Sequence, residues 1–336
     1  MQCPKCSAEL VENQRFCEEC GTRISAAAPL PADTAVCRCA PGSALPNANG
    51  FCENCGFKLA APVPAVGAVK YDYPPDLGLV SDRGRVHPIN QDAGIVGRSP
   101  SGAVAIAVAD GVSSSDQAEV ASATAVAAAY REMVEAPADL PGEEIVRRAV
   151  AAAHAAVMNI PYTNTPMEEP ETTIVVALVR GSSTSVAWVG DSRAYTISTA
   201  YSRLVTRDDS WLADVVEEGH MTLEQALADN RSHSITQCLG MLDGEIRIHV
   251  RNLNLEPDTW LLLCTDGLWN YFDQTPAMAQ AVAAATSEAD AFELCQHLVK
   301  LANQAGGHDN ITAGAYRIGS SAGVFQAVTD KVPTIP

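Results

Sequence analysis

The sequence predicts an α+β fold in which antiparallel sheets and helices form separate layers. Apolar runs typical of short buried strands occur in AVAIAVAD, TTIVVALV, SVAWVG and WLLLCTD. Alanine-rich stretches at 116–135 and 143–158 have the length and composition of helices. Because the strands and helices do not alternate strictly, antiparallel layers are favoured over a parallel doubly wound sheet.

The chain divides by composition into a cysteine-rich N-terminal part, a long main domain and a short tail. Its 336 residues leave room for one domain of about 250 residues and some small modules. We expect the main domain at 76–318 and a tail without usable periodicity at 319–336. The segments 25–35 and 60–75 are small and proline-bearing, which predicts extended linkers.

Eight of the eleven cysteines lie before residue 56 in closely spaced pairs, which favours zinc in a reducing compartment over disulfides. We expect a zinc ribbon at 1–24 and a second at 36–59, each holding one structural Zn²⁺ with four thiolates. The second is less regular because its leading pair is C-x-C. The predicted ligands are Cys3, Cys6, Cys17 and Cys20 in the first ribbon and Cys37, Cys39, Cys52 and Cys55 in the second.

The other three cysteines, Cys238, Cys264 and Cys295, stand singly in apolar stretches. Cysteine in such surroundings commonly behaves as a small buried hydrophobe. We therefore expect these thiols to belong to the core of the main domain.

The formal net charge of −18 opposes nonspecific binding to nucleic acid or to anionic lipid. No segment approaches the roughly 20 continuous apolar residues that span a bilayer, and the N-terminus MQCPKCSAEL lacks a basic and apolar leader. We expect a cytoplasmic monomer that binds neither membranes nor nucleic acid.

Five aspartates recur at the ends of apolar runs in the main domain. A strand that ends in aspartate followed by glycine or asparagine delivers a carboxylate to the sheet edge while the backbone turns sharply. One such aspartate is more often a simple turn residue, but five in one domain indicate a cluster. Hard carboxylate oxygens favour Mg²⁺ or Mn²⁺ over zinc. The residues are Asp92, Asp110, Asp191, Asp266 and Asp309.

Residues 76–317 resemble the metal-dependent protein phosphatase family, also called type 2C. The resemblance rests on stretches that follow the family's order and together are highly specific. They are SDRGRVHPINQD at 81–92, VADGV at 108–112, ETTIVVALV at 171–179, VGDSRAY at 189–195, LVTRDDSW at 204–211, ITQCLG at 235–240, LLLCTDGLW at 261–269 and GGHDNIT at 306–312.

The resemblance implies a four-layer α-β-β-α sandwich of two antiparallel sheets flanked by helix pairs, with two Mn²⁺ or Mg²⁺ ions at one end. By position, Asp110 would bridge the ions and Gly111 would offer its carbonyl, while Asp92, Asp266 and Asp309 would complete the site. Asp191 matches a residue of a third, weaker metal site, and Asn310 would orient its neighbours. The reaction implied is hydrolysis of phosphoserine and phosphothreonine in proteins by a water activated between two metal ions.

The sequence departs from the family at four positions near this centre. His87 stands where many relatives have a phosphate-binding arginine, and unlike arginine it is charged only part of the time near neutral pH. The alternative, which we favour slightly, is that histidine at this position leaves the reaction unchanged. Gln91 replaces a common glutamate, Glu171 a glycine, and Val112 a histidine proposed as general acid in eukaryotic relatives. We include His87 among the catalytic candidates as a speculative donor of the leaving-group proton.

The ribbons carry few basic residues, which disfavours binding to a phosphate backbone. A docking role is expected for them, toward a cognate serine/threonine kinase or its substrates.

The alternative to an active enzyme is a catalytically weak or silent scaffold that binds phosphoproteins. Retention of all five aspartates favours the enzyme, because a scaffold gains nothing from a cluster of like charges. A zinc-ribbon nucleic-acid binder fits the charge least well.

Overall fold

The computed structural model describes residues 69–73, 75–162, 169–242, 245–272, 274–285 and 290–319. The two predicted zinc ribbons and the predicted tail lie outside these residues, apart from Gly319. The described residues thus belong to the main domain and the short segment directly before it.

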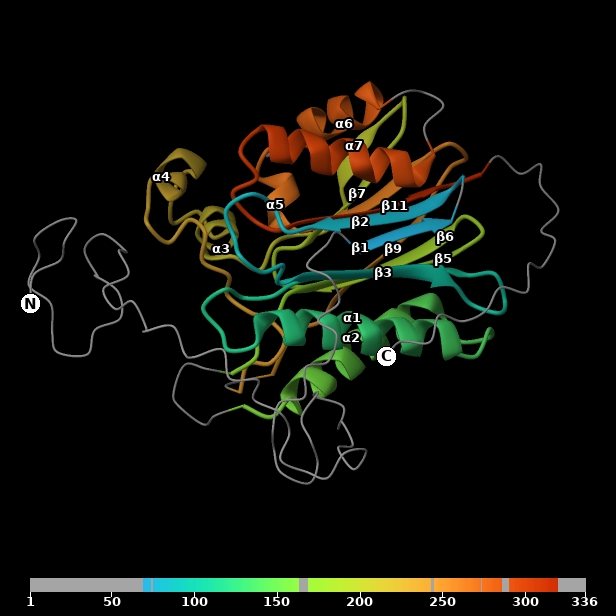
Figure 1. Ribbon diagram of the computed structural model, residues 1–336, viewed down its shortest axis with the longest axis horizontal. Coiled ribbons are helices and arrows are strands. Elements are labelled where there is room, and N and C mark those ends of the chain that lie inside the picture. The colour runs from blue at the N-terminus through green and yellow to red at the C-terminus, as the bar shows by residue number, and fades with distance from the viewer. Residues whose placement is uncertain are drawn as a thin grey trace, which may run out of the picture. The chain divides into compact units, whose positions relative to one another are not determined.

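Two antiparallel sheets form the centre of the domain (Figure 1). The first has the strand order β1-β2-β11-β10-β7-β8 and the second the order β3-β4-β5-β6-β9. All neighbouring strands in both sheets are antiparallel, as the sequence predicts. The strands of the first sheet are β1 (Val69–Tyr73), β2 (Leu77–Asp82), β7 (Arg193–Ile197), β8 (Ser202–Leu204), β10 (Trp260–Cys264) and β11 (Ile311–Arg317). Those of the second are β3 (Asp92–Arg98), β4 (Val104–Asp110), β5 (Ile174–Arg180), β6 (Ser183–Val189) and β9 (His249–Asn254).

Helices cover the outer face of each sheet, which gives the predicted four layers (Figure 1). The helices α1 (Ala118–Glu135) and α2 (Gly142–Met158) pack on the second sheet, close to the two stretches expected to be helical. The helices α6 (Thr275–Ala284) and α7 (Ala291–Gln304) pack on the first sheet. Short helices lie in the connections between these elements. They are α3 (Trp211–Glu217) and α4 (Leu223–Leu227) between β8 and β9, and α5 (Asp266–Trp269) between β10 and α6.

Three apolar clusters hold these layers together. One joins α1 and α2 to the second sheet, and another joins α6 and α7 to the first. The third fills the space between the sheets, where Leu79, Ile106 and Leu263 are fully buried. The alternation along β4 explains this division, since Ala105 and Ala107 face the helices while Ile106 and Val108 face the other sheet.

The single cysteines Cys238, Cys264 and Cys295 are buried, as expected. The start of the domain differs from the expectation, because β1 lies inside the segment 60–75 that the composition predicts to be a linker. This strand pairs with β2 from Val69↔Ser81 to Tyr73↔Leu77. The prolines beside β1 are typical of a linker, but an edge strand also tolerates neighbouring proline.

In the part of the chain that the structure describes, every helix is too short or too polar to cross a bilayer.

Truncating the core between the sheets should destabilise the whole domain. Ile106→Ala should lower the free energy of unfolding by about 2–5 kcal/mol, because Ile106 is completely buried between the sheets. Val120→Ala on the exposed side of α1 should change it by less than about 0.5 kcal/mol. Urea titration followed by tryptophan fluorescence measures both; equal stability of the two variants would contradict this description of the core.

Candidate metal centre

Two of the five predicted aspartates face each other where β3 begins and β4 ends. Asp92 and Asp110 are direct partners in the antiparallel register of these strands. Partners in such a pair have side chains on the same face of the sheet and about 5 Å apart at Cβ. The two carboxyl groups therefore share one corner of the second sheet.

The first sheet brings the other three aspartates to the same end of the sandwich. Asp266 begins α5 directly after β10, and Asp309 precedes β11. Asp191 lies in the turn between β6 and β7, where it joins the two sheets. Like charges link the five carboxyl groups: Asp266 and Asp309 help to raise the pKa of Asp92, and Asp191 and Asp266 help to raise that of Asp110.

Threonine hydroxyls hold the carboxylate of Asp92 and the backbone of Asp110. Thr265 Oγ1 donates to Asp92 Oδ2 at 2.8 Å and accepts from Thr312 N at 3.0 Å. Thr172 Oγ1 donates to the carbonyl of Asp110 at 2.8 Å, and Thr173 Oγ1 accepts from Asp110 N at 3.1 Å. Sequence reasoning misses these supports, although each threonine lies within one of the stretches that carry the family resemblance.

Asn310 ties together the loops around the site, as the resemblance implies. Its Oδ1 accepts from Gln91 N at 2.7 Å, and its Nδ2 donates to the carbonyls of Arg83 and Ile89. Gly111 is needed for a close approach, since a Cβ there would collide with the backbone of Ala118. The β2–β3 loop is thereby fixed against the strand ends.

Burial and mutual repulsion raise the pKa values of these carboxyl groups. Burial is the main cause for Asp92, whose pKa rises to about 8. Repulsion from Asp266 and Asp309 also raises this pKa, whereas the hydrogen bonds from threonine lower it. Burial followed by like charge also raises the pKa values of Asp110, Asp191 and Asp266. The cluster therefore resists being fully ionised unless cations neutralise it.

Two buried carboxylate oxygens have no hydrogen-bond partner among the described residues: Asp92 Oδ1 and Asp266 Oδ1. Such orphaned acceptors among hard oxygen donors fit a divalent cation of the Mg²⁺ or Mn²⁺ type. Within the described ranges, no group of three or more His, Cys, Asp or Glu side chains is placed so that it could hold a metal ion. An ion bound by Asp92 and Asp266 would therefore need water for the rest of its coordination shell, which Mg²⁺ commonly keeps.

The predicted phosphate-binding position lies at the rim of this cluster. His87 Nε2 is 3.5 Å from Asp309 Oδ1, and the two side chains are 34% and 40% exposed. Arg83 Nη1 donates to the carbonyl of His87 at 2.6 Å, which places a permanent positive charge in the same loop. The family resemblance points to His87 and overlooks Arg83.

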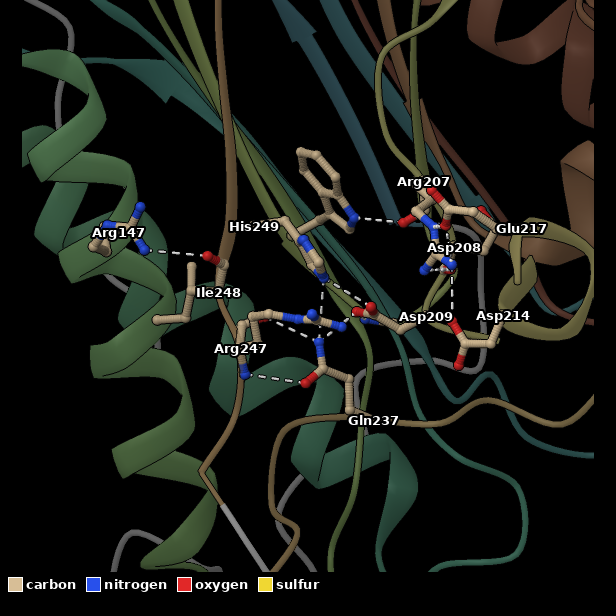
Figure 2. Close-up of polar contacts among 12 residues, drawn as sticks. Arg147, Arg207, Asp208, Asp209, Asp214, Glu217, Gln237, Arg247, Ile248 and His249 are labelled. Atoms are coloured by element: carbon tan, nitrogen blue, oxygen red, sulfur yellow. Dashed lines mark hydrogen bonds and ion pairs between the residues drawn. The ribbon is translucent and has the colours of Figure 1, made fainter. Parts of the chain in front are cut away.

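The turn that carries Asp191 is anchored by contacts of Asp209, which Figure 2 shows with Gln237 and His249. Asp209, which is 2% exposed, accepts from Gly190 N at 2.9 Å and from Gln237 Nε2 at 2.7 Å. His249 Nε2 lies 2.8 Å from the other oxygen of Asp209. On the opposite side, Trp269 Nε1 donates to the carbonyl of Asp191 at 3.0 Å.

A family model, described as protein phosphatase 2C, matches residues 84–302, which include four of the five clustered aspartates and leave out Asp309. The chain belongs to this family. The serine/threonine phosphatase stp of Listeria monocytogenes is 28% identical over 237 residues, which cover 69% of this chain and 91% of that relative.

Solved structures agree with this assignment. The serine/threonine phosphatase of S. agalactiae superposes with a TM-score of 0.63 at 26% identity, covering 71% of this chain and 98% of that one. The catalytic domain of the phosphatase PstP, in complex with two manganese ions, gives a TM-score of 0.58 at 26% identity over 73% of this chain and 98% of that one. The predicted family, two-sheet fold and class of enzyme, a protein phosphatase and thus a hydrolase, are confirmed.

A zinc-ribbon model matches residues 2–24 and so supports the first predicted ribbon with Cys3, Cys6, Cys17 and Cys20. The second ribbon, with its four cysteines between residues 37 and 55, lies outside this match and stays a prediction. All eight cysteines lie outside the described residues.

The raised carboxyl pKa values predict that metal-free protein becomes less stable as pH rises. Asp92 binds its proton more tightly when folded, so its stabilising contribution is complete below the unfolded pKa of 3.8 and is lost as pH rises to about 8. In chelator, the free energy of unfolding should therefore fall between about pH 5 and pH 8. The four tryptophans all lie in the main domain and report its unfolding.

Asp92→Asn should flatten this pH dependence, whereas Asp139→Asn in the exposed α1–α2 connection should leave it unchanged. Urea titrations at several pH values test both variants. A metal-free native domain that gains stability toward pH 8 would show that the aspartate cluster is not under electrostatic strain.

Proposed function

We propose that the chain hydrolyses phosphoserine and phosphothreonine in proteins with two Mn²⁺ or Mg²⁺ ions held by its aspartate cluster. The observation that carries this proposal is the convergence of Asp92, Asp110 and Asp266, with two unpartnered carboxylate oxygens, at one end of the sandwich. The family and the relatives named serine/threonine phosphatases support the same reaction.

In this proposal the carboxylates of Asp92, Asp110, Asp266 and Asp309 and the carbonyl of Gly111 would hold the two ions, and Asp191 would contribute to a third, weaker site. The ions would supply a water of lowered pKa and neutralise charge on the phosphoryl oxygens. The protein's own contribution is to hold these oxygen donors before substrate arrives. Thr265 fixes one carboxylate oxygen of Asp92, which leaves the other free to bind a cation.

The phosphoryl group of the substrate would meet the rim formed by the β2–β3 loop. His87 offers a ring N–H at this rim beside Asp309, and Arg83 supplies the permanent charge that histidine lacks. The leaving-group oxygen needs a proton, and His87 is the candidate donor within the loop. Because His87 is charged only part of the time near neutral pH, phosphate capture should depend more on pH than with an arginine at position 87.

The N-terminal ribbons would act as docking modules, because their paired charges do not favour nucleic acid. We propose that they bind a serine/threonine kinase or the proteins that it phosphorylates. Each ribbon would hold one structural Zn²⁺, with the sulfur ligands predicted from the sequence.

Removing one metal-binding carboxylate should abolish the reaction. With Mn²⁺ and a phosphothreonine peptide, Asp266→Ala should lower kcat/KM by about 100-fold or more, the size of effect expected when a charge essential to the transition state is lost. Asp139→Ala makes the same change at an exposed residue between α1 and α2 and should stay within about twofold of the native chain. Release of inorganic phosphate measures both.

Equal activity of the native chain and Asp266→Ala would refute the catalytic role of the cluster. Absence of hydrolysis by the folded native chain at saturating Mn²⁺ would favour the phosphoprotein-binding scaffold instead.

A further inference from the structure

A pocket of about 430 Å³ opens beside the aspartate cluster. One wall is formed by Val112 and Ser114, which follow Asp110 and Gly111 in the chain. Residues 233–238 with Met241 form a second wall, and Glu171 lines the pocket as well. We call it the Glu171 pocket. It is continuous along the backbone with the metal-binding corner.

Backbone pairing holds both walls of the Glu171 pocket in place. Thr172 makes antiparallel bridges to Gly111 on one side and to Leu239 on the other. Val112 N donates to the carbonyl of Glu171 at 3.0 Å, and Thr172 N donates to that of Leu239 at 3.1 Å. The walls are therefore set by the hydrogen bonds of the domain itself.

The second wall is also fixed by the hydrogen bonds of Gln237 to Asp209 and Arg247 (Figure 2). Gln237 donates to Asp209 Oδ2 at 2.7 Å and to the carbonyl of Arg247 at 2.9 Å, while its Oε1 accepts from Arg247 N at 3.0 Å. Thr236 N donates to the carbonyl of Asp209 at 2.8 Å. This wall thus keeps its position relative to the metal-binding corner.

The lining of the Glu171 pocket includes one acid, Glu171, and one histidine, His233. Glu171 is the one carboxylate among the lining residues, and no lysine or arginine within the described part of the chain forms an ion pair with it. Burial raises the pKa of Glu171, and the negative charge of nearby Glu169 raises it further. A hydrogen bond with the Cys238 thiol partly opposes this rise. A cationic occupant would relieve both effects.

We propose that the Glu171 pocket binds a lysine or arginine side chain of the substrate protein, close in sequence to the phosphorylated residue. The inference rests on the proposed function, because the phosphoryl group must sit at the aspartate cluster. An extended peptide advances about 3.3 Å per residue, so a residue near the phosphorylated one reaches the wall that begins at Val112. The aliphatic stem of the basic side chain would pack on Val112, Ile235 and Met241 while its charge meets Glu171.

The proposal is tested with paired phosphothreonine peptides that differ only in flanking residues, lysine or arginine in one and norleucine in the other. With Mn²⁺, the native chain should hydrolyse the basic peptide with a kcat/KM about tenfold higher, which is the size of one charge-assisted hydrogen bond at a half-buried site. Glu171→Gln should remove this preference while retaining activity on the norleucine peptide. Glu171→Lys should reverse the preference toward a peptide with flanking glutamate.

Glu144→Gln, an exposed residue in the first turn of α2, is the matched control and should keep the native preference. Equal hydrolysis of both peptides by the native chain, or an unchanged preference in both Glu171 variants, would overturn the role of this pocket and leave the proposed function standing. Hydrolysis of neither peptide by the folded native chain would overturn the proposed function and this inference together.

Discussion

Repulsion among buried carboxylates at one end of the sandwich is the constraint on which the rest of the structure depends. Asp92 and Asp110 meet across a strand pair, and Asp266 adds a third charge from the other sheet. Burial raises the pKa of each, so the cluster is a source of strain in the metal-free protein. In the proposed function, divalent cations would turn the same arrangement into a source of stability, because binding to the folded state alone shifts the folding equilibrium.

The fold supports this strain with regular structure around it. Two sheets supply the strand ends, and Thr265 and Thr312 connect the ends through hydroxyl and backbone hydrogen bonds. Asn310 links the β2–β3 loop to the start of β11, so loops far apart in sequence are held as one unit. Burial of the three apolar clusters stabilises the folded domain and so offsets the unfavourable repulsion among the carboxylates.

Much of this architecture could be predicted because its signals are local. Strand ends marked by Asp-Gly or Asp-Asn, and alanine-rich helical stretches, are visible in the sequence, and the resemblance to a family then assembles them into two sheets. The role of Thr265 could not be predicted this way, because it depends on a hydrogen bond to Asp92, which is distant in sequence. The role of Arg83 could not be predicted either, because its hydrogen bond to His87 depends on the shape of the loop. The edge strand β1 escapes sequence reasoning because proline-rich flanks resemble those of a linker.

Glu171 illustrates a different limit. In the sequence it is one departure from a family pattern, and its effect is not predictable from residue type alone. In the structure it lines a pocket whose walls are fixed by Thr172 and Gln237. The same substitution thus becomes a hypothesis about which substrates this phosphatase domain selects.

The central claim, that the aspartate cluster is a strained carboxylate site completed by divalent cations, is tested most directly by calorimetric titration of Mn²⁺ into the zinc-saturated full chain. Because Asp92 has a pKa of about 8, it is largely protonated at about pH 7 without metal, and Mn²⁺ must displace protons. We expect binding of two ions with proton release, seen as heats that depend on the buffer, and loss of both in Asp110→Asn. Binding without proton release, or unchanged binding in Asp110→Asn, would contradict this claim.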